Sequence, residues 1–293
     1  MVKKKKQTNQ KSNERISFID FRANYLGEVG RTHVVNRFGI SDPAASNDLG
    51  EYIRMAPDNL KYDFKTRTHK TTDQFAPQFD FSSSQVLNAL SSGFGDTLEQ
   101  VPQPYVQTAT AVELNQPDPV NIAQISRAIH QQKIVQITYY SLSSGRTTRV
   151  IAPFALINSG LRWHVRAFDR RSGEYRDFVL ARITTARLQN EKIPPEESSA
   201  NDKSWINKIK LEIVPHPKNI QEPKAIELDY GMKKGVLKLE LRQSIAGYIL
   251  RNWNVDCTDN HRLKGPHYQL WLKNEKDINN LDKIILAPGV EEL

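Results

Sequence analysis

The chain has 293 residues and a formal net charge of +8, from 41 Lys and Arg against 33 Asp and Glu. This length is enough for two or three domains, each with its own core. The single cysteine, Cys257, excludes an intrachain disulfide and a zinc site built on paired thiolates. No stretch reaches the roughly 18 apolar residues of a membrane span, and the first residues lack the apolar core of a signal peptide. We therefore expect a cytoplasmic protein with no membrane association.

The positive charge is concentrated in two parts of the sequence. Residues 1–80 carry a net +4 and residues 119–188 a net +8, whereas residues 81–118 carry −4 and residues 189–293 are neutral. Ten of the eleven basic residues within 119–188 are Arg, whose planar guanidinium suits bidentate recognition of phosphate or carboxylate. This segment indicates an anionic ligand or a nucleic-acid surface, unless it forms only a soluble Arg-rich face.

The N-terminal segment begins with a polar, Lys-rich stretch. Residues 1–13 have no apolar periodicity, so we predict a disordered basic arm that serves either as a solubility tail or as a DNA contact. From Glu14 onward, apolar residues recur at spacings of three and four, which predicts an amphipathic helix ending near Gly27. A second, short helix follows Gly30 and is stopped by Gly39, a residue suited to the left-handed conformation after a helix.

A third helix and a hairpin complete this part of the chain. Ser41 is suited to cap the helix, and Pro43 in its first turn loses no hydrogen bond there. After Pro57, apolar and charged residues alternate up to Lys65, which predicts a strand followed by a basic turn. Helix, short helix, tight turn, helix and basic hairpin is the order of a winged helix-turn-helix, which we assign to residues 14–80.

This order predicts DNA binding, with a purely structural helical domain as the alternative. Small polar side chains on the third helix allow it to approach base edges, and basic side chains of the hairpin suit phosphates. Asp42 counts against DNA binding, because phosphates repel a carboxylate unless it accepts a hydrogen bond from a cytosine amine or another side chain. The predicted contacts are Arg31, Thr32, Ser41, Pro43, Ser46, Asn47, Lys65, Arg67, His69 and Lys70.

A linker and a β-rich segment follow. Residues 81–118 contain no Lys or Arg and include several prolines, which predicts a linker with one short helix near Leu87. Residues 119–190 begin with an amphipathic helix, and four strand-like runs with Gly-containing turns come after it. A helix followed by such a meander predicts a small β-barrel. The four runs are Val135–Tyr140, Thr148–Ile157, Arg162–Phe168 and Tyr175–Ile183.

The third of these runs alternates in a way that bears on ligand binding. Trp163, Val165 and Ala167 are expected to face one side of the sheet, and His164 and Arg166 the other. A basic face with interleaved aromatic side chains suits base stacking together with phosphate contact. The alternative is an exposed outer face of the sheet with no ligand.

Residues 204–293 predict a third domain, of mixed α/β structure and balanced charge. The chain contains no G-x-x-x-x-G-K-S/T loop, no G-x-S-x-G elbow and no H-E-x-x-H pair, so we expect no metal, no cofactor and no enzymatic activity. The expected helices and strands of this domain are Ile209–Ile213, Lys224–Asp229, Val236–Leu241, Ser244–Trp253, Tyr268–Leu272 and Ile284–Leu286.

The segment from Asp118 to Ala186 resembles a WYL domain, a ligand-sensing Sm-like barrel of bacterial transcription factors. The name-giving Trp-Tyr-Leu is Trp163-His164-Val165 here, and His164 brings a group that ordinarily titrates near neutral pH. The domain order, together with Phe38–Tyr52 and the APDNLKYD after it, also resembles the repressors of BREX and CBASS phage-defence operons. The residues that carry the WYL resemblance are Ala128, Ile129, Val135, Ile137, Tyr139, Ser141, Pro153, Leu156, Arg176, Phe178, Leu180, Arg182 and Ile183.

Together, the patterns and the resemblance predict an α+β multidomain protein with a winged helix-turn-helix, an Sm-like barrel and a C-terminal domain that dimerises. The resemblance implies a homodimeric repressor that binds an inverted-repeat operator in double-stranded DNA and responds to a nucleotide or oligonucleotide effector in the barrel. Two other functions stay open: a non-regulatory module that binds RNA or single-stranded DNA and, with least support, an enzyme such as a nuclease. The predicted ligand-binding residues are Tyr139, Ser141, Arg149, His164, Arg166, Phe178 and Arg182.

Overall fold

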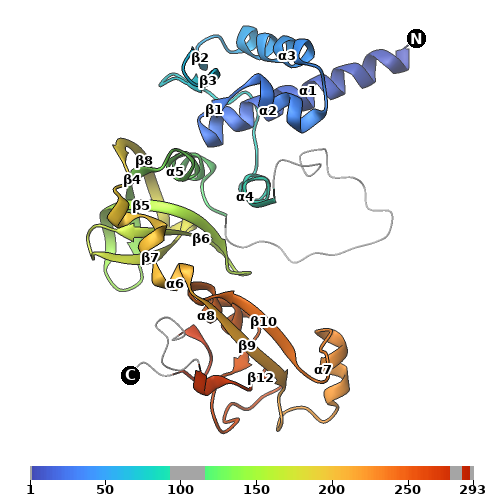
Figure 1. Ribbon diagram of the computed structural model, residues 1–293, viewed down its shortest axis with the longest axis vertical. Helices are drawn as coiled ribbons and strands as arrows, with labels where there is room; N and C mark the ends of the chain where they lie inside the picture. The colour runs from blue at the N-terminus through green and yellow to red at the C-terminus, as the bar shows by residue number, and fades with distance from the viewer. Residues whose placement is uncertain (1, 93–115, 278–285, 291–293) are drawn as a thin grey trace.

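The computed structural model describes residues 2–92, 116–277 and 286–290. Three bodies follow one another along the longest axis of the molecule (Figure 1). The N-terminal helices and hairpin form one end, a five-stranded sheet lies in the middle, and a four-stranded sheet with its helices forms the other end. This mixed arrangement of helices and sheets confirms the α+β multidomain class.

The N-terminal body is a winged helix-turn-helix. Strand β3 lies between β1 and β2 and is antiparallel to both, so the hairpin of β2 and β3 forms the wing. The predicted order of elements is confirmed. The elements are α1 (Val2–Leu26), β1 (Glu28–Val29), α2 (Arg31–Phe38), α3 (Asp42–Met55), β2 (Leu60–Asp63) and β3 (Thr68–Thr71).

The turn between α2 and α3 forms as the sequence predicts. Gly39 has a φ of 62° and ends α2 in the left-handed conformation. Ser41 caps α3, because its Oγ accepts a hydrogen bond from the backbone N–H of Ala44 at 3.4 Å. Arg15 of α1 donates to both carboxylate oxygens of buried Asp48, at 2.6 and 3.1 Å, and this ion pair fixes α3 against α1.

Helix α1 differs from the prediction at its start. The disordered arm predicted for residues 1–13 is wrong, because the helix extends from Val2 to Leu26. Lys and Gln have good helix propensity, and the packed C-terminal half of the helix supplies the nucleus from which the preceding turns propagate. A segment without apolar periodicity is therefore helical here because it continues a helix that packing stabilises.

Helix α1 also has two apolar faces, whereas the sequence predicts one. Ile16, Ile19 and Ala23 are buried in the core of the winged helix. Phe21 and Tyr25, on another side of the helix, are buried in the core of the central body. One helix thus contributes to two cores and joins the winged helix-turn-helix to the central body.

The central body is a helix-covered, five-stranded antiparallel sheet with the strand order β7-β6-β5-β4-β8. The fourth predicted run is divided: β7 ends at Val179, and a short 3-10 helix, Leu180–Arg182, leads into a fifth strand that the sequence analysis missed. The elements are α4 (Ser83–Ser92), α5 (Pro119–Gln131), β4 (Lys133–Ser141), β5 (Gly145–Asn158), β6 (Trp163–Asp169), β7 (Glu174–Val179) and β8 (Ile183–Lys192).

The start of the predicted linker belongs to this central core. Val86, Leu87 and Ala89 of α4 are buried in the same cluster as Ile122 and Ile125 of α5. The short helix predicted near Leu87 is therefore confirmed as α4, and its packing into the core of the central body was not predicted. The rest of the linker prediction, residues 93–115, lies outside the described residues.

The C-terminal body has a four-stranded sheet with the order β10-β9-β12-β11. Its core includes Leu211, Ile213, Leu250 and Leu270, which are fully buried. The predicted strand Ile284–Leu286 lies almost entirely outside the described residues. The elements are α6 (Lys203–Ile206), β9 (Lys208–Pro215), α7 (Pro223–Asp229), β10 (Leu237–Arg242), α8 (Gln243–Asn252), β11 (Val255–Asp256) and β12 (Leu270–Leu272).

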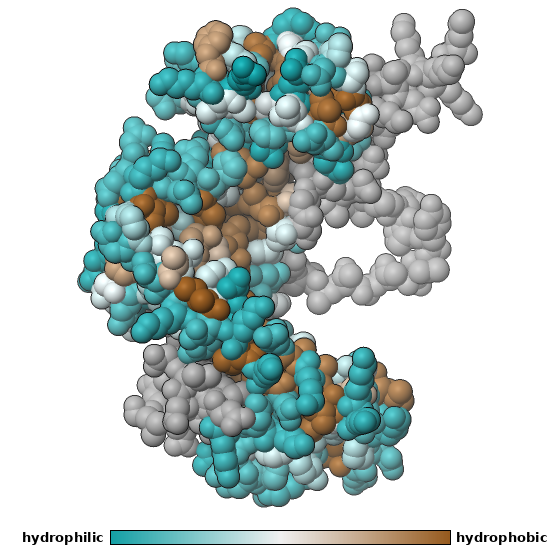
Figure 2. Space-filling model, viewed as in Figure 1, coloured by the Kyte–Doolittle hydropathy of each residue, from teal (hydrophilic) through white to brown (hydrophobic). Residues whose placement is uncertain are grey.

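The surface is hydrophilic over most of the face shown in Figure 2, and hydrophobic residues gather in the hollow between the N-terminal and central bodies. Within the described parts of the chain, no helix combines the length and the apolar character that crossing a bilayer demands.

Candidate DNA interface and barrel pocket

A groove of about 590 Å³ lies between α2, α3 and the wing. Five of the predicted DNA contacts line it: Arg31 and Thr32 at the start of α2, Ser46 on α3, and Arg67 and His69 on the wing. Arg31, Thr32, Ser46 and Arg67 are exposed, and His69 is half-buried. Three separate elements therefore place small polar and basic groups on one concave surface, which is the arrangement that contact with base edges and phosphates requires.

The other predicted contacts lie around this groove and do not line it. Asn47 is exposed on α3, and Ser41 and Pro43 occupy the exposed start of that helix, where Ser41 acts as its cap. Lys65 and Lys70 line the opposite face of the wing. Lys70 also forms an ion pair with Glu28 of β1, so part of its charge is already compensated.

Asp42, which counted against DNA binding, has a partner in the structure. Its carboxylate lies 3.2 Å from the guanidinium of Arg31, and both side chains are exposed. The pair joins the start of α3 to the start of α2 at the edge of the groove. A carboxylate that accepts from a neighbouring side chain is the condition under which Asp42 is compatible with nearby phosphates.

The predicted contacts omit six of the residues that line the groove, among them Tyr62 and Gly50. Tyr62 lines it from β2, and its ring lies 5.0 Å from the ring of His69. Gly50 lines it from the middle of α3. A glycine inside a helix costs about 1 kcal/mol relative to alanine, and this cost is the sequence signal that could have identified Gly50 as a functional position.

A second pocket, of about 230 Å³, lies where the barrel meets α8, and we call it the barrel pocket. It brings together three of the predicted ligand residues, Tyr139, His164 and Arg182, with Arg162 from the barrel and Arg251 from α8. Among the described residues, Arg162, Arg182 and Arg251 form no ion pair. The barrel pocket can therefore offer guanidinium groups to an anion.

Three predicted ligand residues have other contacts. Ser141 caps its own turn, with its Oγ 3.3 Å from the backbone nitrogen of Ser143. Arg149 forms an ion pair with buried Asp169 and lies 5.7 Å from the ring centroid of Phe178, which is itself in the barrel core. These side chains support the barrel and its β4-β5 turn, and none of them lines the barrel pocket.

Arg166 is the clearest departure from the prediction. Its side chain is fully buried, with Nε and Nη2 donating to Asp202 at 2.6 and 2.9 Å and Nη1 donating to Asp177 at 2.8 Å. The face of β6 that carries Arg166 was expected to be open, but the segment before α6 and helix α8 cover it. Arg166 thus joins the barrel to the start of α6 through Asp202, and Asp177, on the neighbouring barrel strand β7, accepts its third hydrogen bond.

His164 lies on the same covered face. Its ring centroid is 4.8 Å from that of Tyr248 on α8, and the side chain is buried. Burial lowers the pKa of His164 to about 4, against the weaker opposing effect of Asp177. The expectation that His164 titrates near neutral pH is therefore wrong, because an imidazolium is disfavoured in this dry environment.

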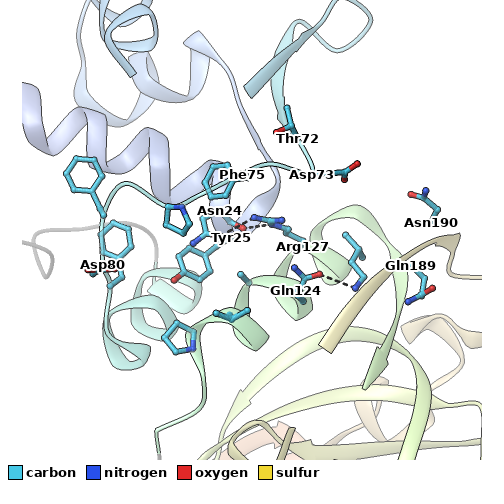
Figure 3. Close-up of a pocket in the computed structure, with 17 residues that line it drawn as sticks. Asn24, Tyr25, Thr72, Asp73, Phe75, Asp80, Gln124, Arg127, Gln189 and Asn190 are labelled. Carbon is cyan, nitrogen blue, oxygen red and sulfur yellow. Dashed lines mark hydrogen bonds between the residues drawn. The ribbon is translucent and has the colours of Figure 1, made fainter. Parts of the chain in front are cut away.

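A third cavity, of about 900 Å³, separates the winged helix from the barrel, and Figure 3 shows the residues around it. Arg127 of α5 crosses this boundary and donates to the backbone oxygen and, at 3.1 Å, to the Oδ1 of Asn24 in the last turn of α1. Ser126 donates to the backbone oxygen of Tyr25 at 2.7 Å. Side chains of the barrel domain therefore satisfy carbonyls at the C-terminal end of α1 that lack intrahelical partners.

The contact between α5 and the N-terminal body, which we call the joint, also includes the wing. Glu28 pairs with Lys70 of β3, and its carboxylate lies 3.4 Å from Nε2 of His130 on α5. Burial alone raises the pKa of Glu28, but hydrogen bonds from Lys70 and His130 outweigh burial and lower it. Glu28 thus links the barrel helix α5 to a strand of the wing.

Three family models match consecutive parts of the chain. Residues 11–92 match the BrxR transcriptional regulator winged helix-turn-helix domain, residues 120–188 match the WYL domain, and residues 208–278 match the BrxR transcriptional regulator C-terminal dimerization domain. The three matches follow the three bodies of the structure in order.

Full-length relatives agree with these matches. The chain is 35% identical to the DNA-binding transcriptional repressor CapW of Escherichia coli (strain KTE188), over 92% of this chain and 91% of that protein. It is 29% identical to CapW of Pseudomonas aeruginosa, over 91% and 90%. It is 31% identical to CapW of Stenotrophomonas maltophilia, over 83% of each protein. Regulators of this kind are not enzymes, and the chain belongs to the family of WYL-domain transcriptional regulators that includes BrxR and CapW.

Proposed function

We propose that this protein is a homodimeric repressor that binds an inverted-repeat operator in double-stranded DNA. The observation that carries this proposal is the groove between α2, α3 and the wing, where Arg31, Ser46 and Arg67 meet on one surface. Ser46 is suited to base edges, and the two arginines are suited to phosphates or to guanine. The repressor activity of the CapW relatives supports the same function.

The C-terminal body is the proposed dimerisation unit, because it matches the C-terminal dimerization domain of BrxR. A two-fold dimer presents two identical α3 helices. Such a dimer reads two half-sites separated by about one helical turn, roughly 34 Å, or a multiple of it. This geometry makes an inverted repeat the expected operator.

The barrel pocket is the proposed effector site. Arg162, Arg182 and Arg251 surround a pocket next to Tyr139, so its chemistry suits the phosphate of a nucleotide or of a short oligonucleotide. Arg251 comes from the C-terminal body and the other two from the barrel, so an anion held by all three contacts both bodies. Such an effector regulates only if it binds the DNA-bound and free states with different affinity. The joint at Arg127 offers a contact route from the barrel to α1.

The proposed target is a phage-defence operon next to the gene for this protein, on the basis of the BrxR and CapW relatives. A reporter gene under the upstream promoter tests this: repression by wild type is expected, and relief by a variant with Lys65 and Arg67 changed to Gln. Unchanged reporter expression with or without the protein argues against a repressor and favours the alternative of an RNA or single-stranded DNA module.

The effector is tested separately by calorimetry with cyclic nucleotides and short oligonucleotides. Arg182→Gln and Arg251→Gln are expected to weaken binding at least tenfold, and Arg176→Gln, an exposed arginine paired with Glu174, serves as the control. Equal binding by all three variants removes the barrel pocket as the effector site.

A further inference from the structure

A cavity of about 420 Å³ lies in the N-terminal body between α1, α2 and α4. It is separate from the groove between α2, α3 and the wing and from the barrel pocket. Its polar lining consists of Arg22 from α1 and His33, Asn36 and Arg37 from α2. Phe18, Phe21 and Leu90 are among its apolar lining residues. No Asp or Glu is among the described residues that line it, so the cavity has a cationic wall with no counter-charge. We call it the arginine cavity.

Both arginines carry a nitrogen that is buried without a partner. The Nε atoms of Arg22 and Arg37 are shielded from solvent and make no hydrogen bond among the described residues. Burial lowers the pKa of Arg22, and Glu28 opposes this effect only in part. Arg15, on the same helix as Arg22, shows the contrast, since it is fully engaged by Asp48.

An arginine Nε that has lost its water without gaining an acceptor is unfavourable, because the desolvation cost is not repaid. His33 adds a neutral imidazole to the wall, because burial together with the charge of Arg22 lowers its pKa. His33 Nδ1 accepts a hydrogen bond from the backbone N–H of Gly30 at 3.0 Å, which fixes the ring in place. An oxyanion in this cavity supplies acceptors for the two Nε atoms, which the described residues do not provide.

We propose that the arginine cavity binds a small molecule that presents a phosphate or carboxylate group to Arg22 and Arg37. The apolar side chains on the other walls favour a ligand with an apolar or aromatic body over a bare ion. Arg37 is engaged only by a stacking contact, 5.4 Å from the ring centroid of Phe38, and its hydrogen-bonding nitrogens have no acidic partner in the described chain.

The position of the arginine cavity gives the ligand a means to affect DNA binding. Arg37 is in the last turn of α2, close to the turn that leads into α3. Arg31 and Thr32, at the other end of α2, line the groove between α2, α3 and the wing. Ala89 of α4 lines the cavity and is also buried in the core of the barrel. A ligand here connects the helix that precedes the recognition helix to a helix anchored in the central body.

The test uses the full-length protein at constant ionic strength, with sodium phosphate and sodium benzoate as separate probes and melting temperature and calorimetry as measurements. Wild type is expected to be stabilised by at least one probe, and Arg22→Gln and Arg37→Gln to weaken its binding at least tenfold. The stronger probe shows whether phosphate or carboxylate is preferred. Without a probe, Arg22→Gln is expected to melt at or above the temperature of wild type, because it removes a partly buried charge that forms no ion pair among the described residues.

Two further variants keep this site distinct from the proposed effector site. Arg162→Gln alters the barrel pocket and is expected to retain probe binding in the arginine cavity, and Lys61→Gln removes an exposed charge as a general control. Loss of probe binding in Arg162→Gln but not in Arg22→Gln or Arg37→Gln places the anion in the barrel pocket and overturns the proposal. Absence of binding of both probes by wild type also overturns it. If Arg22→Gln does not fold, Arg37→Gln carries the same comparison.

Discussion

Arg166 donates three hydrogen bonds to two carboxylates, two of them to Asp202 at 2.6 and 2.9 Å, and it is fully buried. The ion pair of Arg166 and Asp202 joins β6 of the barrel to the segment that leads into the C-terminal body. Asp202 is also the N-terminal cap of the short helix α6, since it accepts from the backbone N–H of Trp205. The residue that most resembled a ligand contact in the sequence is thus a structural link between two bodies.

Arg166→Ala is expected to destabilise the protein by about 3–5 kcal/mol, because it leaves two carboxylates buried without their cation. Urea unfolding measures this change. Arg176→Ala, which removes an exposed pair with Glu174, is the matched control and is expected to cost about 0–1 kcal/mol. A loss below about 1 kcal/mol for Arg166→Ala contradicts the structural role.

His164 predicts a specific dependence of stability on pH. Its pKa is about 4 in the folded protein and about 6.5 in an unfolded chain. As pH falls from about 6.5 to about 4, the unfolded state takes up a proton that the folded state does not, so the free energy of unfolding decreases. The contribution of neutral His164 is fully present above pH 6.5.

His164→Phe is expected to remove this part of the pH dependence, measured as the difference between the unfolding curves of wild type and variant at pH 7 and pH 5. His267→Gln, at an exposed position, serves as the control and is expected to retain the dependence of wild type. An equal loss of stability on acidification in His164→Phe and wild type means that His164 is not the group responsible.

How far the sequence predicted the structure depends on how local each feature is. The cap at Ser41 and the left-handed Gly39 involve neighbouring residues, and both are confirmed. Strand β8 was missed, because its second half, Arg187–Lys192, is polar and lacks the apolar alternation of a half-buried strand. The second apolar face of α1 was also missed, because Phe21 is buried by a different domain.

The site shows the same division. Arg31, Ser46 and Arg67 were found because the helix-turn-helix order fixes which residues face outward. The partners of Arg166 were not found, because Asp202 lies 36 residues further along the chain and only the tertiary structure brings the two together. Arg251 was missed for the same reason, since it reaches the barrel pocket from the C-terminal body.

Replacing Gly50 by alanine is expected to raise the stability of the protein and to weaken its binding to DNA. A Cβ at this position has room within the protein, with the nearest atom, Nη1 of Arg54, 3.7 Å away. Gly50→Ala is therefore expected to stabilise the protein by about 1 kcal/mol through helix propensity. Gly50 lines the groove between α2, α3 and the wing, so the added methyl group is expected to weaken operator binding in a fluorescence anisotropy titration.

Met55→Ala, near the exposed end of α3 and outside the groove lining, is the control for DNA affinity. If Gly50→Ala binds the operator as tightly as wild type, close approach of DNA to this position is excluded.

Arg127 is expected to stabilise the contact between α5 and the C-terminal end of α1. Arg127→Ala removes a charged donor from the carbonyl of Asn24, a loss of about 1.5–3 kcal/mol for such a hydrogen bond. Hydrogen exchange is expected to become faster at the end of α1 while the C-terminal body, probed at β9, keeps its protection. Unchanged exchange near Asn24 and Tyr25 contradicts a capping role for Arg127.

The most direct test of operator recognition is a competition titration between the protein's own upstream DNA and a shuffled duplex of equal length at fixed salt. Wild type is expected to prefer the upstream DNA by at least a hundredfold. A variant with Ser46 and Asn47 changed to Ala is expected to lose most of that preference, whereas Arg67→Gln weakens both duplexes and lowers the salt slope by about 1. Equal affinity of wild type for the two duplexes contradicts sequence-specific repression.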